Sequence, residues 1–349
     1  MALAFLVPGQ LDQLTGGYLY DRHIVEGLRA RGQAVTVVEL PGQYPQADAP
    51  TRASAAAALA QLPDQSMVII DGLALPGLAD CLQAQASRLH LVGMIHHPLS
   101  LETGLDADSA CHYAQLEAEL WPHLQGAICP SENTARALLA AGLAADRVAV
   151  VSPGTHRPAS IHRATSHAPL QLLAVGTITP RKGHLLLVDA LAHLPELDWR
   201  LSCIGSLTRD PAATTALQER ITAHGLGDRI ALLGEQTPEQ LAQAYRQADL
   251  FALPSYHEGY GMVFAEALAH GLPILATTAV ALTDTIPADA LLLVSPGDLP
   301  ALRDALERAL CDGDLRARLR AAALRAASTL PDWDRTVQDW MAALEKVTR

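Results

Sequence analysis

Two carboxylates flank a glycine-rich step in the segment HEGYGMVFAEALAHGLPI, residues 257–274. Glu258 precedes Gly259 and Gly261, and Glu266 follows Glu258 by eight positions inside an apolar run with helical spacing. Glycines let a backbone approach a ligand closely, and the first N–H groups of a helix attract phosphate. With Glu258 in a loop, both carboxylates can bind hydroxyls on either side of an anion, the layout of a sugar diphosphonucleoside. The alternative is one continuous helix with both acids facing solvent.

Lysine is scarce, and one of the two lysines lies where an anion would need it. Of 25 basic residues only Lys182 and Lys346 are lysines. Lys182 belongs to TPRKGH, residues 179–184, between an apolar run and a helical segment. There Lys182 and Arg181 would neutralise a diphosphate leaving group as its charge develops. The alternative is a solvated helix start.

Two further stretches in the first half could reach a ligand. GMIHHPLSLETG (93–104) places His96 and His97 at the end of an apolar run, although such histidines are more often packed or solvent-facing. DQLTGGYLYD (12–21) places Gly16 and Gly17 at the start of a predicted helix. A lone Gly-Gly is weak evidence and is not the G-x-G-x-x-G dinucleotide fingerprint.

Short apolar runs alternate with amphipathic or Ala-rich segments, a pattern that predicts parallel sheets covered by helices on both faces. The predicted strands are 3–7, 34–38, 67–70, 91–95, 126–129 and 148–151, then 172–176, 199–205, 229–234, 250–254, 273–277 and 291–294. The predicted helices are 17–31, 52–61, 76–87, 110–121 and 131–141, then 183–193, 213–224, 238–247, 261–270, 298–311, 313–328 and 332–347.

A polar, proline-bearing segment at 152–171 interrupts this alternation and has the composition of a linker. The sequence therefore predicts an α/β chain of two facing Rossmann-like domains, residues 1–160 and 161–330, with a last helix in 331–349 that crosses back to the first domain. Ligands of such sheets bind beyond the carboxyl ends of the strands, so we expect an interdomain cleft to hold the site.

The segment HEGYGMVFAEALAHGLPI resembles the E-x7-E signature of the retaining glycosyltransferases of family 4, which have the GT-B fold. The order of the stretches IHHP, VVSPGTH, VGTITPRKGH, CIGS, LLGE and PSYHEGYG is also similar to that family, so the resemblance covers nearly the whole chain. It implies a nucleotide-sugar-binding second domain and an acceptor-binding first domain.

The resemblance implies a role for each matching residue. Glu258 would contact the transferred sugar and Glu266 the ribose, while His96 would contact the sugar from the first domain and Lys182 the diphosphate. His96, Lys182 and Glu258 are the implied catalytic residues. The other implied donor-binding residues are Gly16, Gly17, Arg181, Gly205, Tyr260, Gly261, Met262 and Glu266. Residues expected near the acceptor are Tyr18, His97, Glu102 and Thr103.

The sequence departs from the family pattern at one position. Thr177 stands where the family usually has an arginine that partners the lysine, and Arg181 is the candidate replacement. The implied reaction is same-face substitution, in which the departing phosphate takes the acceptor's proton and the protein stabilises charge and orients substrates.

Charge and cysteine content exclude several classes of protein. The net charge of −12 argues against a nucleic-acid binder. Five scattered cysteines without a C-x-x-C pair indicate reduced thiols, and the N-terminus lacks the features of a signal peptide, so we expect a cytoplasmic protein. Residues 1–163 contain no lysine and carry a net charge of −6, which favours a small soluble acceptor over a membrane lipid.

No metal or cofactor is expected. The histidines lack H-E-x-x-H spacing, and three scattered D-x-D triplets are unspecific. A sugar-nucleotide epimerase would act on the donor alone, and a pyridoxal-phosphate phosphorylase would need Lys182 or Lys346 in a cofactor motif. A non-catalytic sensor would bind the donor without turnover. The residues leave the oligomeric state, the donor base and the sugar open.

Overall fold

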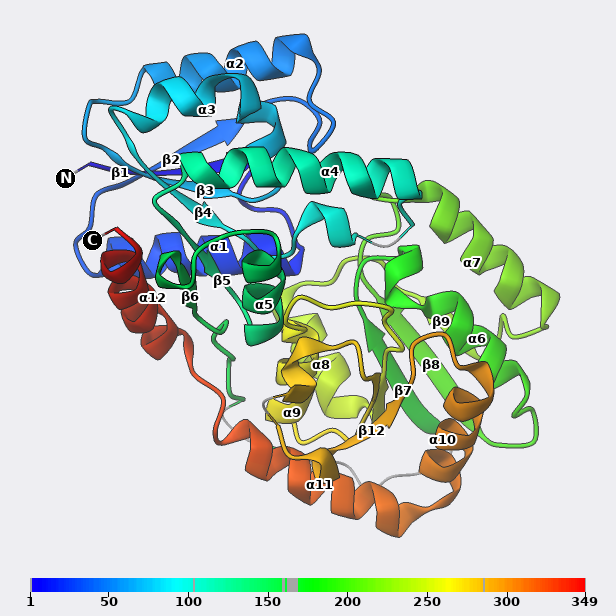
Figure 1. The fold of residues 1–349 in the computed structure, drawn as a ribbon. Helices are drawn as coiled ribbons and strands as arrows, with labels where there is room; N and C mark the ends of the chain where they lie inside the picture. Colours follow the sequence, from blue (N-terminus) through cyan, green and yellow to red (C-terminus); the bar gives the residue numbers. More distant parts are fainter. Residues whose placement is uncertain (1, 103, 159–160, 162–168, 285, 349) are drawn as a thin grey trace. The chain divides into compact units, whose positions relative to one another are not determined.

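The computed structural model describes residues 2–348 except 103, 159–160, 162–168 and 285. The chain divides into two compact units (Figure 1). Unit 1 consists of Met1–Gly154 with Pro331–Arg349, and unit 2 of Thr155–Leu330.

Unit 1 contains a six-stranded parallel sheet in the order β2-β1-β3-β4-β5-β6. Its first three strands are fully or partly buried because the apolar runs face helices on both sides. In the register of β3 and β4, Asp71 lies opposite Met94. The strands are β1 (Leu3–Pro8), β2 (Val35–Leu40), β3 (Met67–Asp71), β4 (His90–Met94), β5 (Gly126–Cys129) and β6 (Val148–Val150).

Helices cover both faces of this sheet. Figure 1 shows α2 and α3 on one face and α1 with α12 on the other. Gly27 allows α1 and α12 to pack closely, because a Cβ atom there would lie 2.4 Å from Cγ2 of Val337. The helices are α1 (Gly16–Ala30), α2 (Ala49–Ala60), α3 (Ala79–Ala86), α4 (Ala107–Leu120), α5 (Glu132–Ala140) and α12 (Trp333–Val347).

Unit 2 repeats the architecture with the order β12-β11-β10-β7-β8-β9. The strands are β7 (Leu170–Val175), β8 (Trp199–Ile204), β9 (Ile230–Leu232), β10 (Leu250–Ala252), β11 (Ile274–Thr277) and β12 (Leu291–Val294). The helices are α6 (His184–Ala192), α7 (Pro211–Ala223), α8 (Pro238–Gln247), α9 (Met262–Ala269), α10 (Leu299–Cys311) and α11 (Gly313–Ala327).

These elements confirm the predicted alternation and the Rossmann-like class of both units. One predicted helix, 76–87, differs: a 3₁₀ turn at Leu75–Leu78 precedes α3, with Pro76 in that turn. Proline has no N–H for a regular helical bond, which suits it to the start of a helical segment. Among the described residues, no helix has the length and apolar composition needed to cross a membrane.

Candidate functional site

The loop after β7 brings Lys182 to the carboxyl end of the unit 2 sheet. A 3₁₀ turn at Pro180–Lys182 leads into α6 through Gly183, whose φ of 71° is left-handed. A Cβ atom on Gly183 would lie 2.2 Å from the carbonyl oxygen of Pro254, so both conformation and space require glycine here. This close approach holds the 180–184 turn against the segment that leads to Glu258.

Lys182, Arg181, Ser255 and Glu258 form a group that we call the Lys182 cluster. Nζ of Lys182 lies 2.6 Å from Oε1 of Glu258, and Nη1 of Arg181 lies 3.3 Å from Oε2. The hydroxyl of Ser255 donates to Oε1 at 2.8 Å. Arg181 also donates to the carbonyl oxygen of His257 at 2.8 Å. The sequence predicted Lys182 and Glu258 separately, and the structure joins them in one ion pair.

Glu258 is 5% exposed, and its protonation is set by the cations around it. Burial alone raises the pKa of this carboxyl, but the charges of Lys182 and Arg181 outweigh burial, and hydrogen bonds from Lys182 and Ser255 add to their effect. The pKa of Glu258 falls to about 2. The cluster therefore carries one net positive charge from its two cations and one carboxylate.

Backbone bonds fix the loop between Glu258 and α9. The N–H of Glu258 donates to Ala279 and the N–H of Leu282 donates to Tyr260. Gly261, with φ of 98°, is the N-cap of α9 and has no side chain to cap the first N–H groups. The predicted loop position of Glu258 and a helix start at Gly261 or Met262 are thus confirmed, and the reading of one continuous helix is wrong.

Glu266 lies on the second turn of α9 in a different environment from Glu258. Its Oε2 accepts a hydrogen bond from the hydroxyl of Tyr245 at 2.8 Å, and the Tyr245 ring stacks on His270. Burial raises the pKa of Glu266 to about 7, although the bond from Tyr245 opposes the shift. The two predicted acids therefore differ in charge state near neutral pH.

In unit 1, His96 lies among two acids that the sequence reasoning missed. Nε2 of His96 lies 2.9 Å from Oδ1 of Asp21 and 3.7 Å from Oδ2 of Asp71. We call Asp21, Asp71 and His96 the Asp21 cluster. Asp71 ends β3 and His96 follows the neighbouring β4, while Asp21 comes from α1. Asp71 could have been noticed from the sequence because it ends an apolar run. Nothing in the sequence, however, indicated that it lies near His96.

The predicted glycine pair does open a helix, since α1 begins at Gly16. A Cβ atom on Gly17 would lie 3.0 Å from Cδ2 of His96, so Gly17 leaves space for the imidazole. A second predicted glycine, Gly205, packs against backbone: a Cβ atom there would lie 2.1 Å from the carbonyl oxygen of Gly176. Both glycines thus have packing reasons for their small size.

Residues 161–326 match the family model described as Glycosyl transferases group 1. This group 1 region contains the whole Lys182 cluster and α9.

Curated relatives carry the same reaction class in their names. The D-inositol 3-phosphate glycosyltransferase of Xylanimonas cellulosilytica is 34% identical over 220 residues, covering 58% of this chain and 52% of that protein. The enzyme of that name from Nocardia farcinica is 36% identical over 200 residues, covering 52% of this chain and 43% of that protein. The chain spans about half the length of the curated relatives it matches.

Solved structures resemble the chain over nearly its full length. Sucrose-phosphate synthase from Thermosynechococcus elongatus aligns with a TM-score of 0.82 at 20% identity, covering 99% of this chain and 98% of that one. Anabaena Alr3699/HepE, solved in complex with UDP and glucose, aligns with a TM-score of 0.75 at 19% identity, covering 99% of each chain. At these identities the likeness shows the fold, which is GT-B.

The residues predicted near an acceptor come from α1 and from the segment that follows β4. The hydroxyl of Tyr18 donates to the carbonyl oxygen of Pro8 at 2.5 Å. His97 and Glu102 are partly exposed, and Thr103 lies outside the described residues. Glu117, which the sequence reasoning missed, accepts from the N–H of Leu99 at 2.6 Å and so fixes the turn before Glu102.

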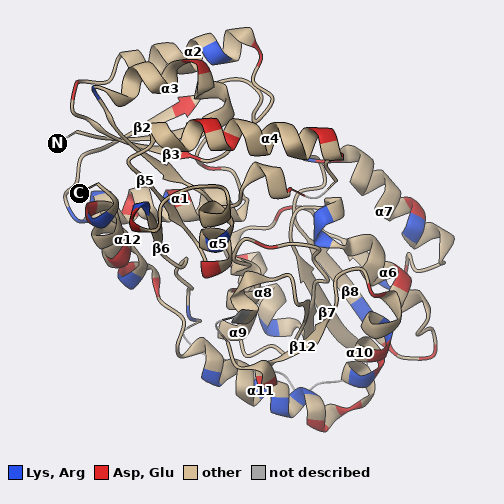
Figure 2. Cartoon of the chain, viewed as in Figure 1, with Lys and Arg blue, Asp and Glu red and all other residues tan. Residues whose placement is uncertain are grey.

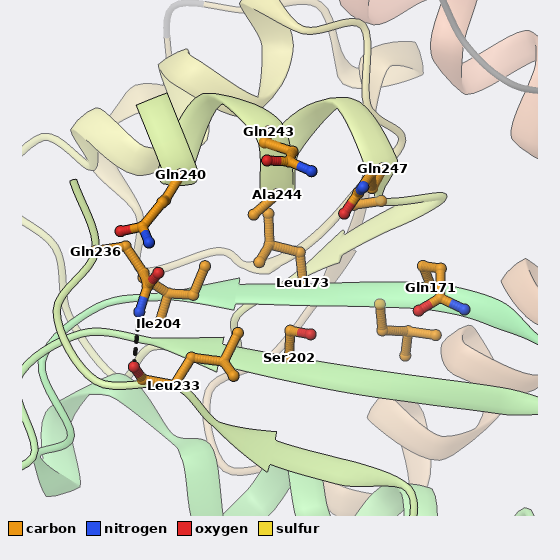
Figure 3. Close-up of a pocket in the computed structure, with 12 residues that line it drawn as sticks. Gln171, Leu173, Ser202, Ile204, Leu233, Gln236, Gln240, Gln243, Ala244 and Gln247 are labelled. Atoms are coloured by element: carbon orange, nitrogen blue, oxygen red, sulfur yellow. Dashed lines mark hydrogen bonds between the residues drawn. The ribbon is translucent and has the colours of Figure 1, made fainter. Parts of the chain in front are cut away.

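A pocket in the group 1 region is distinct from the Lys182 cluster. It has a volume of about 210 Å³ and lies between α8 and the strands β7 and β8 (Figure 3). Figure 3 shows glutamine side chains of α8 above Gln171 and Ser202 of the sheet. None of the Lys182 cluster lines this pocket, so the pocket and the predicted site differ.

Proposed function

We propose that this chain is a retaining glycosyltransferase of family 4 that moves a sugar from a nucleotide-diphosphate sugar to a small-molecule acceptor. The match of residues 161–326 to the group 1 model supports the reaction class. The observation that carries the proposal is the Lys182 cluster, in which two cations contact one buried carboxylate in the loop that leads into a glycine-capped helix. A net positive charge and a helix N-terminus together favour an anion.

In this proposal the donor is held by separate groups of unit 2. Lys182 and Arg181 bind the diphosphate, and Arg181 replaces the arginine expected where Thr177 stands. The backbone N–H groups of Tyr260, Gly261 and Met262 bind the sugar and diphosphate. Glu266 accepts a hydrogen bond from the ribose, and Glu258 accepts from the sugar while holding Lys182 in place. No metal or cofactor is part of the proposal.

The reaction proceeds by same-face substitution. The bond between the anomeric carbon and the diphosphate oxygen breaks, and a bond from the acceptor oxygen to the same face of that carbon forms. The leaving diphosphate takes the acceptor's proton. Lys182 and Arg181 stabilise the charge that develops on the leaving group, and His96 hydrogen-bonds the transferred sugar.

For the acceptor we propose a small soluble molecule, with an inositol phosphate as the first to test, because the curated relatives bear that name. Basic ribbon segments are sparse over α2, α3 and α4 in Figure 2. Of these three helices only α2 carries a lysine or arginine, Arg52. A surface of this kind lacks the cationic patch that anionic lipids attract.

The donor half of the proposal is tested by titration calorimetry with UDP, GDP and ADP in turn. We expect one of them to bind, and Glu266→Ala to weaken its binding roughly tenfold because the ribose loses a hydrogen bond to the carboxyl group of Glu266. Glu307→Ala, at an exposed position on α10, is the matched control and should bind like the wild type. Failure of all three nucleotides to bind would overturn the proposal.

The reaction is tested by NMR of mixtures that contain the donor with inositol 3-phosphate or neutral polyols. We expect a product with the donor's anomeric configuration, and Glu258→Ala to lower turnover more than nucleotide binding. An inverted product would contradict the retaining mechanism. Conversion of the donor without acceptor would instead indicate an epimerase, and binding without any turnover would indicate a sensor.

A further inference from the structure

The Asp21 cluster buries two carboxyl groups next to one imidazole. Asp21 is 0% exposed and Asp71 is 3% exposed. The ligand atoms of the three side chains lie within 4.8 Å of one another, and the two carboxyl groups are within hydrogen-bonding reach. Two adjacent carboxylates in such a place repel each other and have lost hydration, so they cannot both be ionised without compensation.

One buried carboxyl oxygen of the Asp21 cluster accepts no hydrogen bond from the described residues. Oδ1 of Asp71 accepts from the N–H of Leu73 at 2.6 Å, and Oδ1 of Asp21 faces Nε2 of His96. Oδ2 of Asp21 is buried, and no described residue donates to it. A proton on Asp71 would supply the missing donor, because a protonated carboxyl donates where a carboxylate only accepts.

We propose that Asp71 holds a proton which it donates to Oδ2 of Asp21, so that the acid pair carries one negative charge and fixes His96 with its proton on Nε2. Asp21 and Asp71 are then positioning residues that act through His96. This inference deepens the proposed function, since it rests on His96 as a sugar contact. In a neutral imidazole with Nε2 protonated, Nδ1 is an acceptor, suited to a sugar hydroxyl rather than a phosphate.

The residues around His96 favour one orientation of its imidazole ring. Its side chain is 22% exposed, and Gly17 packs against the Cδ2 side of the ring. The Tyr20 ring lies 5.7 Å from the His96 ring, but its hydroxyl already donates to the carbonyl oxygen of Val151 at 2.6 Å. Asp21, Asp71 and Tyr20 are placed against His96, and of these the two acids contact Nε2, so the acid pair controls the proton on that atom.

The effects of burial on the pKa values also favour a protonated Asp71 and a neutral His96. Burial, reinforced by the charge of Asp21, raises the pKa of Asp71 well above its usual range. Burial lowers the pKa of His96, which keeps the imidazole neutral. A cation in place of the shared proton would also compensate the charge, but divalent ions that bind carboxylates usually keep water ligands, and both carboxyl groups are almost fully buried.

The protonation state is tested directly on the wild-type chain by NMR with ¹⁵N-labelled histidine, with His96 assigned by His96→Gln. We expect Nε2 of His96 to be protonated and Nδ1 unprotonated at pH 8, where Asp21 is ionised. The opposite tautomer, or an imidazolium at this pH, would overturn the proposal. This readout needs no substrate, so it separates failure of the inference from failure of the proposed function.

A matched pair of variants tests the proton on Asp71. Asp71→Asn keeps a donor toward Asp21 and an acceptor for Leu73, so it mimics the protonated acid, whereas Asp71→Ala removes both. We expect Asp71→Ala to raise the donor KM roughly tenfold or more and to mix the His96 tautomers, and Asp71→Asn to restore both to within about threefold. An Asn variant as impaired as the Ala variant would contradict the shared proton. So would a stoichiometric divalent metal, measured by mass spectrometry, that the Asn variant loses.

Discussion

Glu258 in unit 2 and Asp21 in unit 1 are both buried carboxylates near the carboxyl end of a parallel sheet, yet their neighbours have opposite character. Glu258 faces the cations of Lys182 and Arg181, and its pKa is lowered to about 2. Asp21 faces another acid and an imidazole, and burial raises its pKa to about 7. Burial opposes charge in both places, so the neighbouring charges decide the outcome.

This difference indicates that the Lys182 cluster and the Asp21 cluster suit different chemical groups of a ligand. With Glu258 ionised, the cations of Lys182 and Arg181 leave the Lys182 cluster with one net positive charge, which suits an anion such as diphosphate. The Asp21 cluster carries at most one negative charge beside a neutral imidazole and suits hydroxyl groups. Variants of Lys182, Glu258 and Glu266 test how far neighbouring charges control the buried acids of unit 2.

The largest effect is expected from removing the cation of the Lys182 cluster. Lys182→Ala should lower kcat/KM by roughly 10²- to 10³-fold, because the leaving diphosphate loses a preorganised charge. Steady-state kinetics with the donor identified by calorimetry measures this. Arg308→Ala, at an exposed position on α10, is the control and should keep wild-type kinetics. Equal kcat/KM values for the two variants would remove Lys182 from the mechanism.

A second test asks whether the ion pair also stabilises the fold. Lys182→Ala leaves Glu258 buried beside Arg181 alone, so we expect the free energy of unfolding to fall by about 3 kcal/mol. Adding Glu258→Gln should recover part of this loss, because the buried charge is then removed. Urea unfolding of both single variants and the double variant gives the coupling energy. Strictly additive losses would mean that the 2.6 Å contact between Lys182 and Glu258 contributes little.

The sequence predicted most of the fold because the signals for it are local. Apolar runs separated by helical segments do not depend on sheet order, and the strands and helices formed where the pattern placed them. The helix predicted at 76–87 was altered by Pro76, whose effect is limited to one turn.

The site was predicted residue by residue but not as contacts. Lys182 and Glu258 are 76 positions apart, and Asp21 and His96 are 75 apart. Their meeting depends on which strands are neighbours, and the sheet orders of both units depart from chain order. Asp21 and Asp71 looked like ordinary polar residues of a helix and a strand end. They meet His96 because β3 pairs with β1, which leads into α1, on one side and with β4 on the other.

The smallest expected effect is a difference in how Glu266 and Glu258 make the free energy of unfolding depend on pH. The pKa of Glu266 is raised to about 7 from 4.5, so between these pH values the folded state keeps a proton that the unfolded state has lost. Its contribution to stability is therefore complete below pH 4.5 and is lost as the pH rises to about 7. The contribution of Glu258 to stability depends on pH in the opposite direction. It is complete above pH 4.5 and is lost as the pH falls towards 2, because the pKa of Glu258 is lowered in the folded state.

Glu266→Gln isolates the first of these contributions, because glutamine still accepts a hydrogen bond from Tyr245 but does not titrate. Between pH 5 and 8 the wild-type free energy of unfolding should fall by about 2.5 kcal/mol more than that of the variant, because the pKa of Glu266 is about 7 in the folded chain. Urea unfolding at each pH measures the two curves, and Glu307→Gln on α10 should follow the wild type. Restricting the range to above pH 5 keeps Glu258 ionised throughout, and Asp21 titrates in both proteins and cancels. Parallel curves for Glu266→Gln and wild type would mean that Glu266 is ionised in the folded chain, which would remove the difference from Glu258 on which the comparison rests.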